Sequence, residues 1–544
     1  MSPFLRSGHL DPFPRENLPP LESWPALDLA KAGLAYPDRL NVVTELLDAH
    51  LPARGAHPAI VTDDAIWSYA ELAERVNRIA NALIRDLGLV TGNRVLLRAA
   101  NTPMMVAAYL AVLKAGGVVV ATMPMLRAGE LVYPLDKARI GLALCDASLL
   151  LDLETASSRA REPARIVAWN GADSELERLM GKPGYDRFEA ADTANDDVAL
   201  IAFTSGTTGE PKGTMHLQRD LLAICDCYGA KVLRADPSDR FIGSPPLAFT
   251  FGLGGLVLFP MRIGATMILP NRTSPADLVA AIEQHKATVT FTAPTAYKVM
   301  LDRMEGRDLS SLRICVSAGE TLPKAIFEAW RAQTGLPLMD GIGATEMLHI
   351  FIGAPRDRIR AGATGLPVPG YEARIVDEAG RELPDGTPGR LAVRGPTGCR
   401  YLADPRQLNY VQDGWNITGD TYLRDADGYF WYQARSDDMI ISAGYNIAGP
   451  EVEACLLTHD AVVECGVVGA PCPDRGQIVT AYVVLRAGFS GDEALVKVLQ
   501  DHVKAGIAPY KYPRAIVFVD ALPKTASGKL QRFALRERAV APRS

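Results

Sequence analysis

The fold class of this chain is decided by the stretch Thr204-Ser205-Gly206-Thr207-Thr208-Gly209-Glu210-Pro211-Lys212-Gly213. An apolar run over residues 197–203 precedes it, as a buried strand would. A strand that leads into a loop rich in Gly, Thr and Ser is suited to hold phosphate, because glycines allow close backbone approach and successive N–H groups attract anions. Lys212 adds a mobile positive charge. The stretch therefore predicts a nucleotide site, with a solvated flexible turn as the alternative.

This loop is not of the Walker A type. A Walker A loop needs G-x-x-x-x-G-K followed by Ser or Thr, whereas Gly528-Lys529 precedes Leu530 and the spacing upstream of Lys212 is wrong. A P-loop kinase or GTPase is therefore disfavoured. The loop instead resembles the signature of the adenylate-forming enzymes, which include acyl-CoA synthetases, adenylation domains and luciferases. The resemblance implies that ATP is contacted by Thr204, Ser205, Gly206, Thr207, Thr208 and Lys212.

Length and composition limit the class of protein. A chain of 544 residues can form roughly three or four compact units. The hydrophobic share of 48% and the charged share of 22% are typical of a soluble globular protein. The net charge of -6 argues against a nucleic-acid partner. Lys114 and Pro260-Met261-Arg262 interrupt the two most apolar windows, so we expect no membrane span.

Cysteine usage and the N-terminus bear on the compartment. The cysteines lie scattered at 145, 225, 227, 315, 399, 455, 465 and 472. Only Cys225 and Cys227 lie close together, and no second pair completes a zinc site, so we interpret the cysteines as buried free thiols in a reducing compartment. The charged N-terminus has no apolar core of the kind that a secretory signal needs. We expect a cytoplasmic protein. The sequence is compatible with a homodimer.

The order of apolar runs predicts an α/β fold. Residues 1–40 are Pro-rich and irregular, typical of a surface arm. From 42 to 345, helical patterns such as Tyr69–Leu87 alternate with short apolar runs, which predicts strand–helix units with a largely parallel sheet. The predicted strands include 94–99, 117–121, 197–203, 288–292 and 312–317.

Two later blocks differ in character. Over 362–434, Gly and Pro turns separate short runs such as 371–376 and 389–393, which predicts a small β-rich subdomain. After the polar stretch 435–438, apolar runs at 462–468 and 478–485 and a helical pattern at 492–505 predict a small α+β domain. We therefore divide the chain into an N-terminal domain over 1–434, a hinge over 435–438 and a mobile C-terminal domain over 439–544.

A second Gly-rich turn is expected where Asp340-Gly341-Ile342-Gly343-Ala344 leads into Thr345 and Glu346. Magnesium prefers one or two carboxylates together with phosphate oxygens, so Glu346 is a candidate metal ligand and Thr345 a candidate phosphate contact. A helix start would look the same. The turn also matches the second core motif of the adenylate-forming enzymes.

A third motif, Trp415-Asn416-Ile417-Thr418-Gly419-Asp420, places a carboxylate after an expected turn. A carboxylate can accept hydrogen bonds from both hydroxyls of a ribose, and a surface turn is the alternative. The family resemblance assigns Asp420 to the ribose and Arg435 as a second contact.

The fourth motif, Pro523-Lys524-Thr525-Ala526-Ser527-Gly528-Lys529, lies near the C-terminus. A lone lysine after glycine is usually solvated. In the family that the chain resembles, however, the matching lysine bridges the substrate carboxylate and the α-phosphate. An ammonium group there would stabilise the charge that shifts among the reacting oxygens, so Lys529 is the main catalytic candidate.

The resemblance implies a mechanism in two steps. The acid and magnesium-ATP form an acyl-adenylate and pyrophosphate, and the thiol of coenzyme A then displaces AMP. Between the steps the C-terminal domain would rotate about Asp437, withdrawing Lys529 and bringing Gly444 and Tyr445 to the thiol tunnel. An ordinary solvated linker would give the same polar hinge sequence.

The acid is suggested by the region that lines the acyl pocket in relatives. The residues concerned are Phe249, Phe251, Ala318, Gly319, Gly341, Gly343 and His349. Their small residues predict a thin slot between apolar faces, which suits a planar ring better than a flexible chain. The alternative is that Phe249, Phe251 and Met347 are ordinary core. His349 either offers a hydrogen bond to a ring substituent or is a helix-face histidine bonded to backbone.

Within the family, the run 341–351 resembles benzoate-CoA ligases. The segments 442–453, 9–11 and 17–20 resemble 2-aminobenzoate-CoA ligases. The chain departs from many relatives at Ile441 and Gln218, where they have Lys and His. We therefore expect an aryl-CoA ligase for benzoate or 2-aminobenzoate. The alternatives are an adenylation enzyme that loads a carrier protein, a non-catalytic nucleotide-binding or acyl-adenylate-binding protein, and a luciferase-like oxidase.

Overall fold

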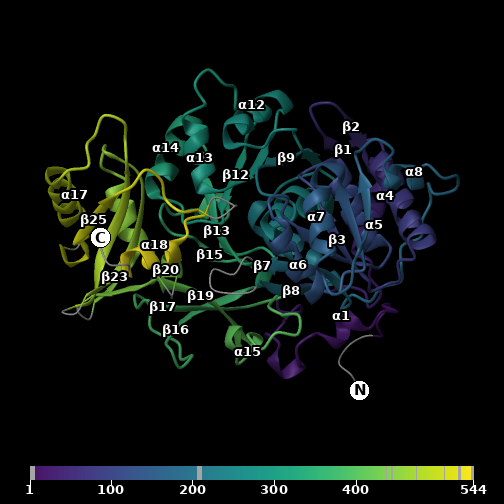
Figure 1. Cartoon of the computed structure of the whole chain (residues 1–544), viewed down its shortest axis with the longest axis horizontal. Helices are drawn as coiled ribbons and strands as arrows, with labels where there is room; N and C mark the ends of the chain where they lie inside the picture. The colour runs from purple at the N-terminus through teal and green to yellow at the C-terminus, as the bar shows by residue number, and fades with distance from the viewer. Residues whose placement is uncertain are drawn as a thin grey trace.

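The structure is a computed structural model that describes residues 6–204, 211–435, 438–442, 445–472, 475–507, 509–524 and 529–540. Within these ranges the strands form four sheets (Figure 1). Two sheets build the bulk of the N-terminal part, a third forms a β-rich subdomain beneath them, and the fourth belongs to the C-terminal part. The predicted α/β class, with a β-rich subdomain and a smaller α+β domain, is confirmed.

The first sheet has the order β6-β5-β3-β4-β7-β8 and is parallel except for the antiparallel pair β7–β8. Side chains of β3 alternate between two cores. One core contacts α4 and α5, and the other contacts α6 and α7. The elements are β3 (Arg94–Arg98), β4 (Val118–Thr122), β5 (Leu142–Asp146), β6 (Arg165–Trp169), β7 (Val198–Thr204), β8 (Lys212–Leu217), α4 (Tyr69–Asn81), α5 (Pro103–Lys114), α6 (Ala128–Lys137), α7 (Leu150–Ser157), α8 (Glu175–Met180) and α9 (Gln218–Ile224).

The second sheet has the order β15-β14-β13-β12-β11-β9-β10-β1-β2. It is parallel from β13 to β1, and α12, α13 and α14 cover the face away from the first sheet. The elements are β1 (Pro58–Val61), β2 (Ile66–Ser68), β9 (Arg240–Gly243), β10 (Thr266–Ile268), β11 (Val289–Thr292), β12 (Ile314–Ala318), β13 (Leu338–Gly343), β14 (Ile350–Gly353), β15 (Leu366–Pro367), α10 (Thr250–Leu253), η6 (Gly254–Leu258), α11 (Phe259–Ile263), α12 (Pro275–His285), α13 (Pro294–Leu301) and α14 (Lys324–Thr334).

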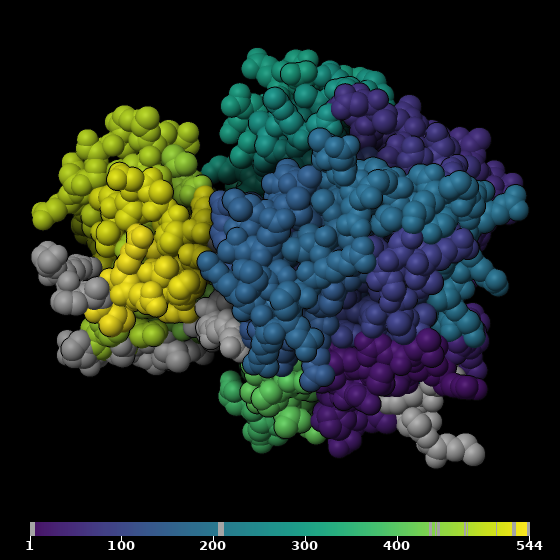
Figure 2. Space-filling model, turned by 45° about the vertical axis from the view of Figure 1, so that its right-hand side comes forward, coloured from purple at the N-terminus to yellow at the C-terminus, as the bar shows by residue number. Residues whose placement is uncertain are grey.

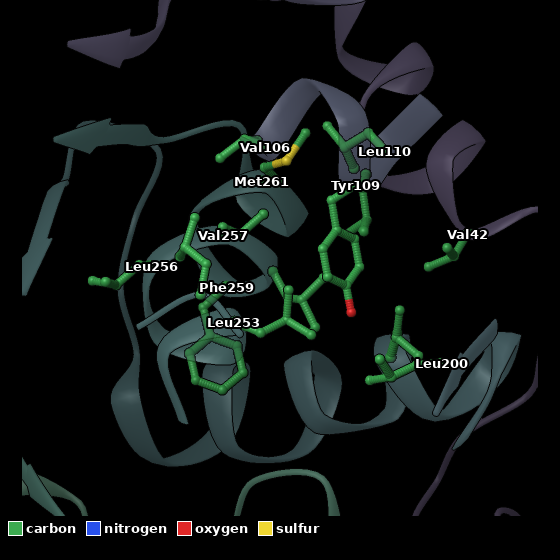
Figure 3. Packing of buried hydrophobic residues seen from close by; sticks show 14 of the residues in the cluster. Val42, Val106, Tyr109, Leu110, Leu200, Leu253, Leu256, Val257, Phe259 and Met261 are labelled. Carbon is green, nitrogen blue, oxygen red and sulfur yellow. The ribbon is translucent and has the colours of Figure 1, made fainter. Parts of the chain in front are cut away.

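A single core cluster joins these two sheets, and α5 lies within it. The helix begins at Thr102, whose hydroxyl accepts from the N–H of Met105, and Pro103 suits its first turn. Every residue from Met105 to Lys114 is buried, as expected for a helix that is apolar all round. Figure 3 shows the Tyr109 side chain of α5 directed toward Leu253, and both belong to this cluster.

The remaining sheets are smaller. The β-rich subdomain has the order β16-β17-β19-β18 with β20 on β19, and the C-terminal domain has the order β22-β21-β24-β23 with β25 parallel to β24. The elements are β16 (Glu372–Val376), β17 (Gly389–Arg394), β18 (Val411–Gln412), β19 (Trp415–Arg424), β20 (Phe430–Arg435), β21 (Ile440–Ser442), β22 (Tyr445–Ile447), β23 (Val462–Cys472), β24 (Gly476–Leu485), β25 (Ala515–Phe518), α16 (Gly449–Leu456), α17 (Glu493–Gly506) and α18 (Arg532–Val540).

The predicted strands and the helices over 69–87 and 492–505 are found within a few residues of their expected bounds. Two expected turns are strands instead. Asp340–Gly343 is the end of β13, because glycines at 341 and 343 let β14 approach closely. Asp420 lies inside β19, at an irregularity where Gly419 has a φ of 77°. In both motifs the polar residues are therefore positioned by a strand and not by a turn.

The eight cysteines are free, and six of them are buried, as predicted. Among the described residues no helix combines the length and apolar character that a membrane crossing requires. The division between domains at 434–438 stays a prediction. The observation that favours it is that β20 and β21 belong to different sheets. In Figure 2 the C-terminal residues, yellow, lie against the N-terminal part, and Lys298 Nζ of α13 donates to the carbonyl of Val463 at 3.0 Å.

Leu110→Ala tests the core between the sheets. Leu110 is fully buried, so we expect the substitution to lower the free energy of unfolding by about 2–5 kcal/mol through lost burial and a cavity. Leu151→Ala is the matched control: that side chain is 80% exposed, and a change within about 0.5 kcal/mol is expected. Denaturant unfolding followed by circular dichroism measures both. Equal effects would contradict the assigned core.

Candidate active site

The predicted phosphate loop joins the antiparallel strands β7 and β8. Their register places Thr204 directly opposite Lys212, so both ends of the loop are fixed by the first sheet. The Lys212 side chain is 26% exposed, and its ammonium is therefore partly accessible. Ser205, Gly206, Thr207 and Thr208 lie outside the described residues. The described part of this hairpin brings Thr204 and Lys212 to one end of the sheet.

Glu346 meets this hairpin from the second sheet. It follows β13 in a short 3₁₀ turn, η7 (Thr345–Met347), and its side chain is only 8% exposed. Lys212 Nζ lies 3.7 Å from Glu346 Oε1, and the hydroxyl of Tyr401 donates to the same oxygen at 2.5 Å. Burial and the neighbouring Glu346 raise the pKa of Tyr401, so the phenol stays protonated and remains a donor. The structure thus brings Thr345 and Glu346 together with Lys212.

A buried polar network supports this turn. His216 of β8 is fully buried, and its Nε2 lies 2.8 Å from the carbonyl oxygen of Thr345. The Nδ1 of the same ring lies 3.9 Å from Asp220, which accepts from Arg400 at 2.7 Å. Burial alone would raise the pKa of Asp220, but Arg400 and His216 outweigh it and hold that pKa well below its usual range. Asp220 therefore stays ionised inside the protein.

Asp420 of β19 and Asp340 of β13 supply two further carboxyl groups. Asp420 is 9% exposed, and its backbone pairs with that of Arg435 across β19 and β20. Asp340, in β13, is half-buried, and desolvation of its carboxyl group raises its pKa to about 8. Burial raises the pKa of Tyr422, and the carboxyl groups of Asp420 and Asp340 raise it further. The sequence indicated no role for Asp340, because this position was expected to lie in a turn and lies in a strand instead.

The predicted acyl pocket includes a cluster of rings around His349. The His349 ring centroid lies 4.6 Å from Phe259, 5.6 Å from Phe251 and 6.3 Å from Phe291. Neither of its ring nitrogens makes a hydrogen bond of standard geometry among the described residues, although the backbone of Phe251 lies close enough to oppose, weakly, the lowering of its pKa by burial. His349 precedes β14 and is not on a helix, so the helix-face interpretation was wrong. A buried imidazole without a partner is expensive unless a ligand pairs with it.

The other predicted pocket residues are distributed around this cluster. Phe249 is half-buried before α10, and Asn101 holds its segment by a bond from Leu247 N at 2.8 Å. Ala318 ends β12, and a Cβ built at Gly319 meets nothing within 4 Å. A Cβ at Gly341 would lie 2.8 Å from Ile350, and one at Gly343 would lie 2.9 Å from the carbonyl carbon of His349. These last two glycines are therefore required by close packing against β14.

The predicted residues of the C-terminal part lie far along the chain from the ring cluster, and only some of them are among the described residues. Lys529 is exposed and precedes Leu530, which pairs with Lys524 in an isolated bridge before α18. Tyr445 begins β22. Gly444 and the hinge residue Asp437 lie outside the described residues.

The residues present are compatible with a magnesium ion bound through nucleotide. Magnesium takes one or two carboxylates plus phosphate oxygens, and Glu346 supplies a single oriented carboxylate next to Lys212. Among the described residues no group of three His, Cys, Asp or Glu side chains converges as an all-protein metal site would. Glu346 would hold the cation, which would neutralise phosphate charge.

Two family models match the sequence. The model described as AMP-binding enzyme matches residues 47–401, and the one described as AMP-binding enzyme C-terminal domain matches residues 451–529. The chain belongs to this family of AMP-binding enzymes. It is an AMP-forming acid–thiol ligase that uses ATP, Mg²⁺ and coenzyme A.

Similar proteins extend the match over almost the whole chain. The benzoate–CoA ligase of Thauera aromatica is 36% identical over 510 residues, which are 92% of this chain and 97% of the relative. A solved anthranilate CoA ligase in complex with anthranoyl-AMP has a TM-score of 0.88 at 35% identity, covering 93% of this chain and 98% of that one. A benzoate CoA ligase from Burkholderia xenovorans LB400 has a TM-score of 0.81 at 35% identity, covering 91% and 100%. The predicted resemblance to adenylate-forming aryl-CoA ligases is confirmed.

We expect His349 to stay neutral at any pH at which the enzyme works. Burial lowers its pKa to about 3, against 6.5 in an unfolded chain. Below pH 6.5 the unfolded chain therefore binds the proton more strongly, and the contribution of His349 to stability falls as the pH falls towards 3. The ring NMR signal, assigned by its loss in His349→Gln, should not shift between pH 5 and 8. A titration midpoint inside that range would show that the ring is solvated.

Proposed function

We propose that the enzyme is an aryl-CoA ligase whose acid is 2-aminobenzoate or benzoate. The observation that carries this proposal is the ring-lined cluster around His349, whose two buried nitrogens make no hydrogen bond of standard geometry among the described residues. A flat ring can pack against such faces, and an amino substituent could pair with the imidazole. The likeness to an anthranilate CoA ligase in complex with anthranoyl-AMP supports the same assignment.

In this proposal the residues take the following roles. Lys212, Thr204 and the loop residues Ser205, Gly206, Thr207 and Thr208 contact the phosphates, Thr345 contacts a phosphate and Glu346 holds the cation. Asp420 and Arg435 bind the ribose. The acid occupies the slot lined by Phe249, Phe251, Ala318, Gly319, Gly341, Gly343 and His349. Gly444 and Tyr445 line the thiol tunnel, and Asp437 is the hinge.

The first step of the reaction develops negative charge that has to be stabilised. A carboxylate oxygen of the acid attacks the α-phosphorus, the bond to pyrophosphate breaks, and negative charge moves onto the leaving oxygens. Lys529 would meet this charge as it develops, which lowers the barrier more than it stabilises the bound substrates. The thiolate of coenzyme A then attacks the acyl carbon and AMP leaves. We place the enzyme in the cytoplasm. The proposal is compatible with either a monomer or a homodimer.

Lys529→Ala should slow adenylate formation by at least ~100-fold, because a contact to transition-state charge is lost. Thioester formation from a premade aryl-adenylate should change far less, since Lys529 is withdrawn in that step. The two half-reactions are measured separately by pyrophosphate exchange and by thioester release. Lys524→Ala is the control: it is exposed on the same segment and pairs with Glu464 at 2.8 Å. Equal losses in both half-reactions would contradict a domain rotation.

The acid itself is tested by pyrophosphate release with magnesium-ATP, with and without coenzyme A. We expect the highest kcat/KM with 2-aminobenzoate or benzoate, lower values with hydroxybenzoates, and little release with acetate or a long-chain fatty acid. Turnover should depend on coenzyme A. Release that coenzyme A fails to accelerate would indicate a carrier protein as acceptor, and absence of release with every acid would refute the enzyme proposal.

A further inference from the structure

Tyr401 contacts Glu346 in the candidate site and belongs to none of the four sequence motifs. Its ring is fully buried, and its hydroxyl donates to Glu346 Oε1 at 2.5 Å across 55 residues of sequence. Hydrogen bonds to an ionised carboxylate are among the shortest and strongest in proteins. The contact therefore fixes one of the two carboxylate oxygens of Glu346.

The backbone around Tyr401 is itself held by β8. Met215 N donates to the carbonyl of Arg400 at 2.7 Å, and Leu402 N donates to the carbonyl of Gly213 at 2.8 Å. Tyr401 N donates to Gln407 Oε1 at 2.9 Å. The phenol thus projects from a segment that is hydrogen-bonded on both sides of it. Its position is set by the same strand that carries Lys212.

Two contacts, one from β8 and one from the segment bonded to β8, hold the Thr345–Glu346 turn. His216 of β8 contacts the carbonyl of Thr345 at 2.8 Å, and Tyr401 contacts the side chain of Glu346. Arg400, the neighbour of Tyr401, forms the buried ion pair with Asp220 at 2.7 Å. Main chain and side chain of the turn are therefore fixed relative to β8 before any nucleotide binds.

Lys212 competes for the oxygen that Tyr401 contacts. Its Nζ lies 3.7 Å from Glu346 Oε1, longer than a charge-assisted hydrogen bond of about 2.7–2.9 Å. If the phenol were absent, the carboxylate could turn to form a close ion pair with Lys212. That pair would occupy both the lysine that phosphate needs and the carboxylate that the cation needs.

We propose that Tyr401 is a positioning residue that holds Glu346 Oε1, so that the second carboxylate oxygen stays available to the cation and Lys212 stays available to phosphate. The inference rests on the proposed role of Glu346 as the cation ligand. Tyr401 touches neither substrate nor cation in this assignment. Its effect should therefore appear in cation affinity more than in affinity for the nucleotide alone.

The test measures Mn²⁺ binding to the full chain with an ATP analogue whose α and β phosphates are joined by a methylene group, so that no reaction occurs. Free Mn²⁺ is counted by electron paramagnetic resonance. Tyr401→Phe should raise the Kd for Mn²⁺ roughly 10-fold, as expected for loss of a hydrogen bond to a charged group. The Kd for the analogue without metal should change less than about 3-fold, the scatter of a neutral surface change.

Tyr410→Phe is the matched control. Its ring packs edge-on against Tyr401 with centroids 5.7 Å apart, and the substitution leaves the Tyr401–Glu346 hydrogen bond in place. We expect Mn²⁺ affinity within about 3-fold of the unaltered protein. Because both substitutions keep the ring, the core around them is preserved, and thermal melting verifies that each variant is folded.

Glu346→Ala separates the two proposals. If it leaves Mn²⁺ affinity unchanged, the proposed role of Glu346 fails, and the role of Tyr401 fails with it. If it weakens binding, Tyr401→Phe in the Glu346→Ala background should have no further effect, because there is no carboxylate to hold. A further loss in that background would overturn the positioning role. So would equal loss of Mn²⁺ and metal-free nucleotide affinity in Tyr401→Phe alone.

Discussion

The nucleotide side of this enzyme depends on a fully buried ion pair between Arg400 and Asp220. Removing two charges from water costs several kcal/mol, and only good geometry and further hydrogen bonds offset that cost. Here Leu217 N also donates to Asp220 at 3.0 Å. The end of β8, the start of α9 and the segment around Arg400 must therefore assemble together. His216 and Tyr401 project from these segments and Lys212 begins the same strand β8, so the proposed site is built directly on the core.

The acid side is built by close packing of rings on glycines. A Cβ at Gly254 would lie 2.3 Å from His349 Cδ2, and a Cβ at Gly255 would lie 2.6 Å from Phe291. Only the absence of side chains at these two positions lets η6 approach both rings. The imidazole is consequently desolvated and neutral, and its nitrogens are suited to a neutral donor or acceptor on the substrate. Packing thus sets the protonation state of the residue proposed to read the ring.

The sequence predicted the features that are local and missed those that join distant segments. The strand before Thr204 and the loop after it are one continuous pattern, and the structure has that strand as β7. Tyr401 gave no signal, because nothing within a few residues of it indicates a carboxylate in η7. The helix-face alternative for His349 was wrong, because a short apolar run does not distinguish a strand start from a helix face. Asp420 was placed after a turn because glycine indicates a turn or a bulge equally well.

The two sides of the site meet on one short segment, since Glu346 and His349 are separated by Met347 and Leu348. Leu348 is fully buried with a φ of 70°, a conformation that costs a branched residue about 1–3 kcal/mol. Such strain persists only where the surroundings determine it. The turn before Leu348 is held at Thr345 by His216 and at Met347 by Thr397, which donates to its carbonyl at 2.8 Å, and β14 after it pairs with β13. Rotation at Leu348 would change the position of the imidazole relative to the carboxylate. The positions of the proposed ring contact His349 and the proposed cation ligand Glu346 are therefore set by one backbone constraint, and a substitution at His349 acts on the same turn that presents Glu346.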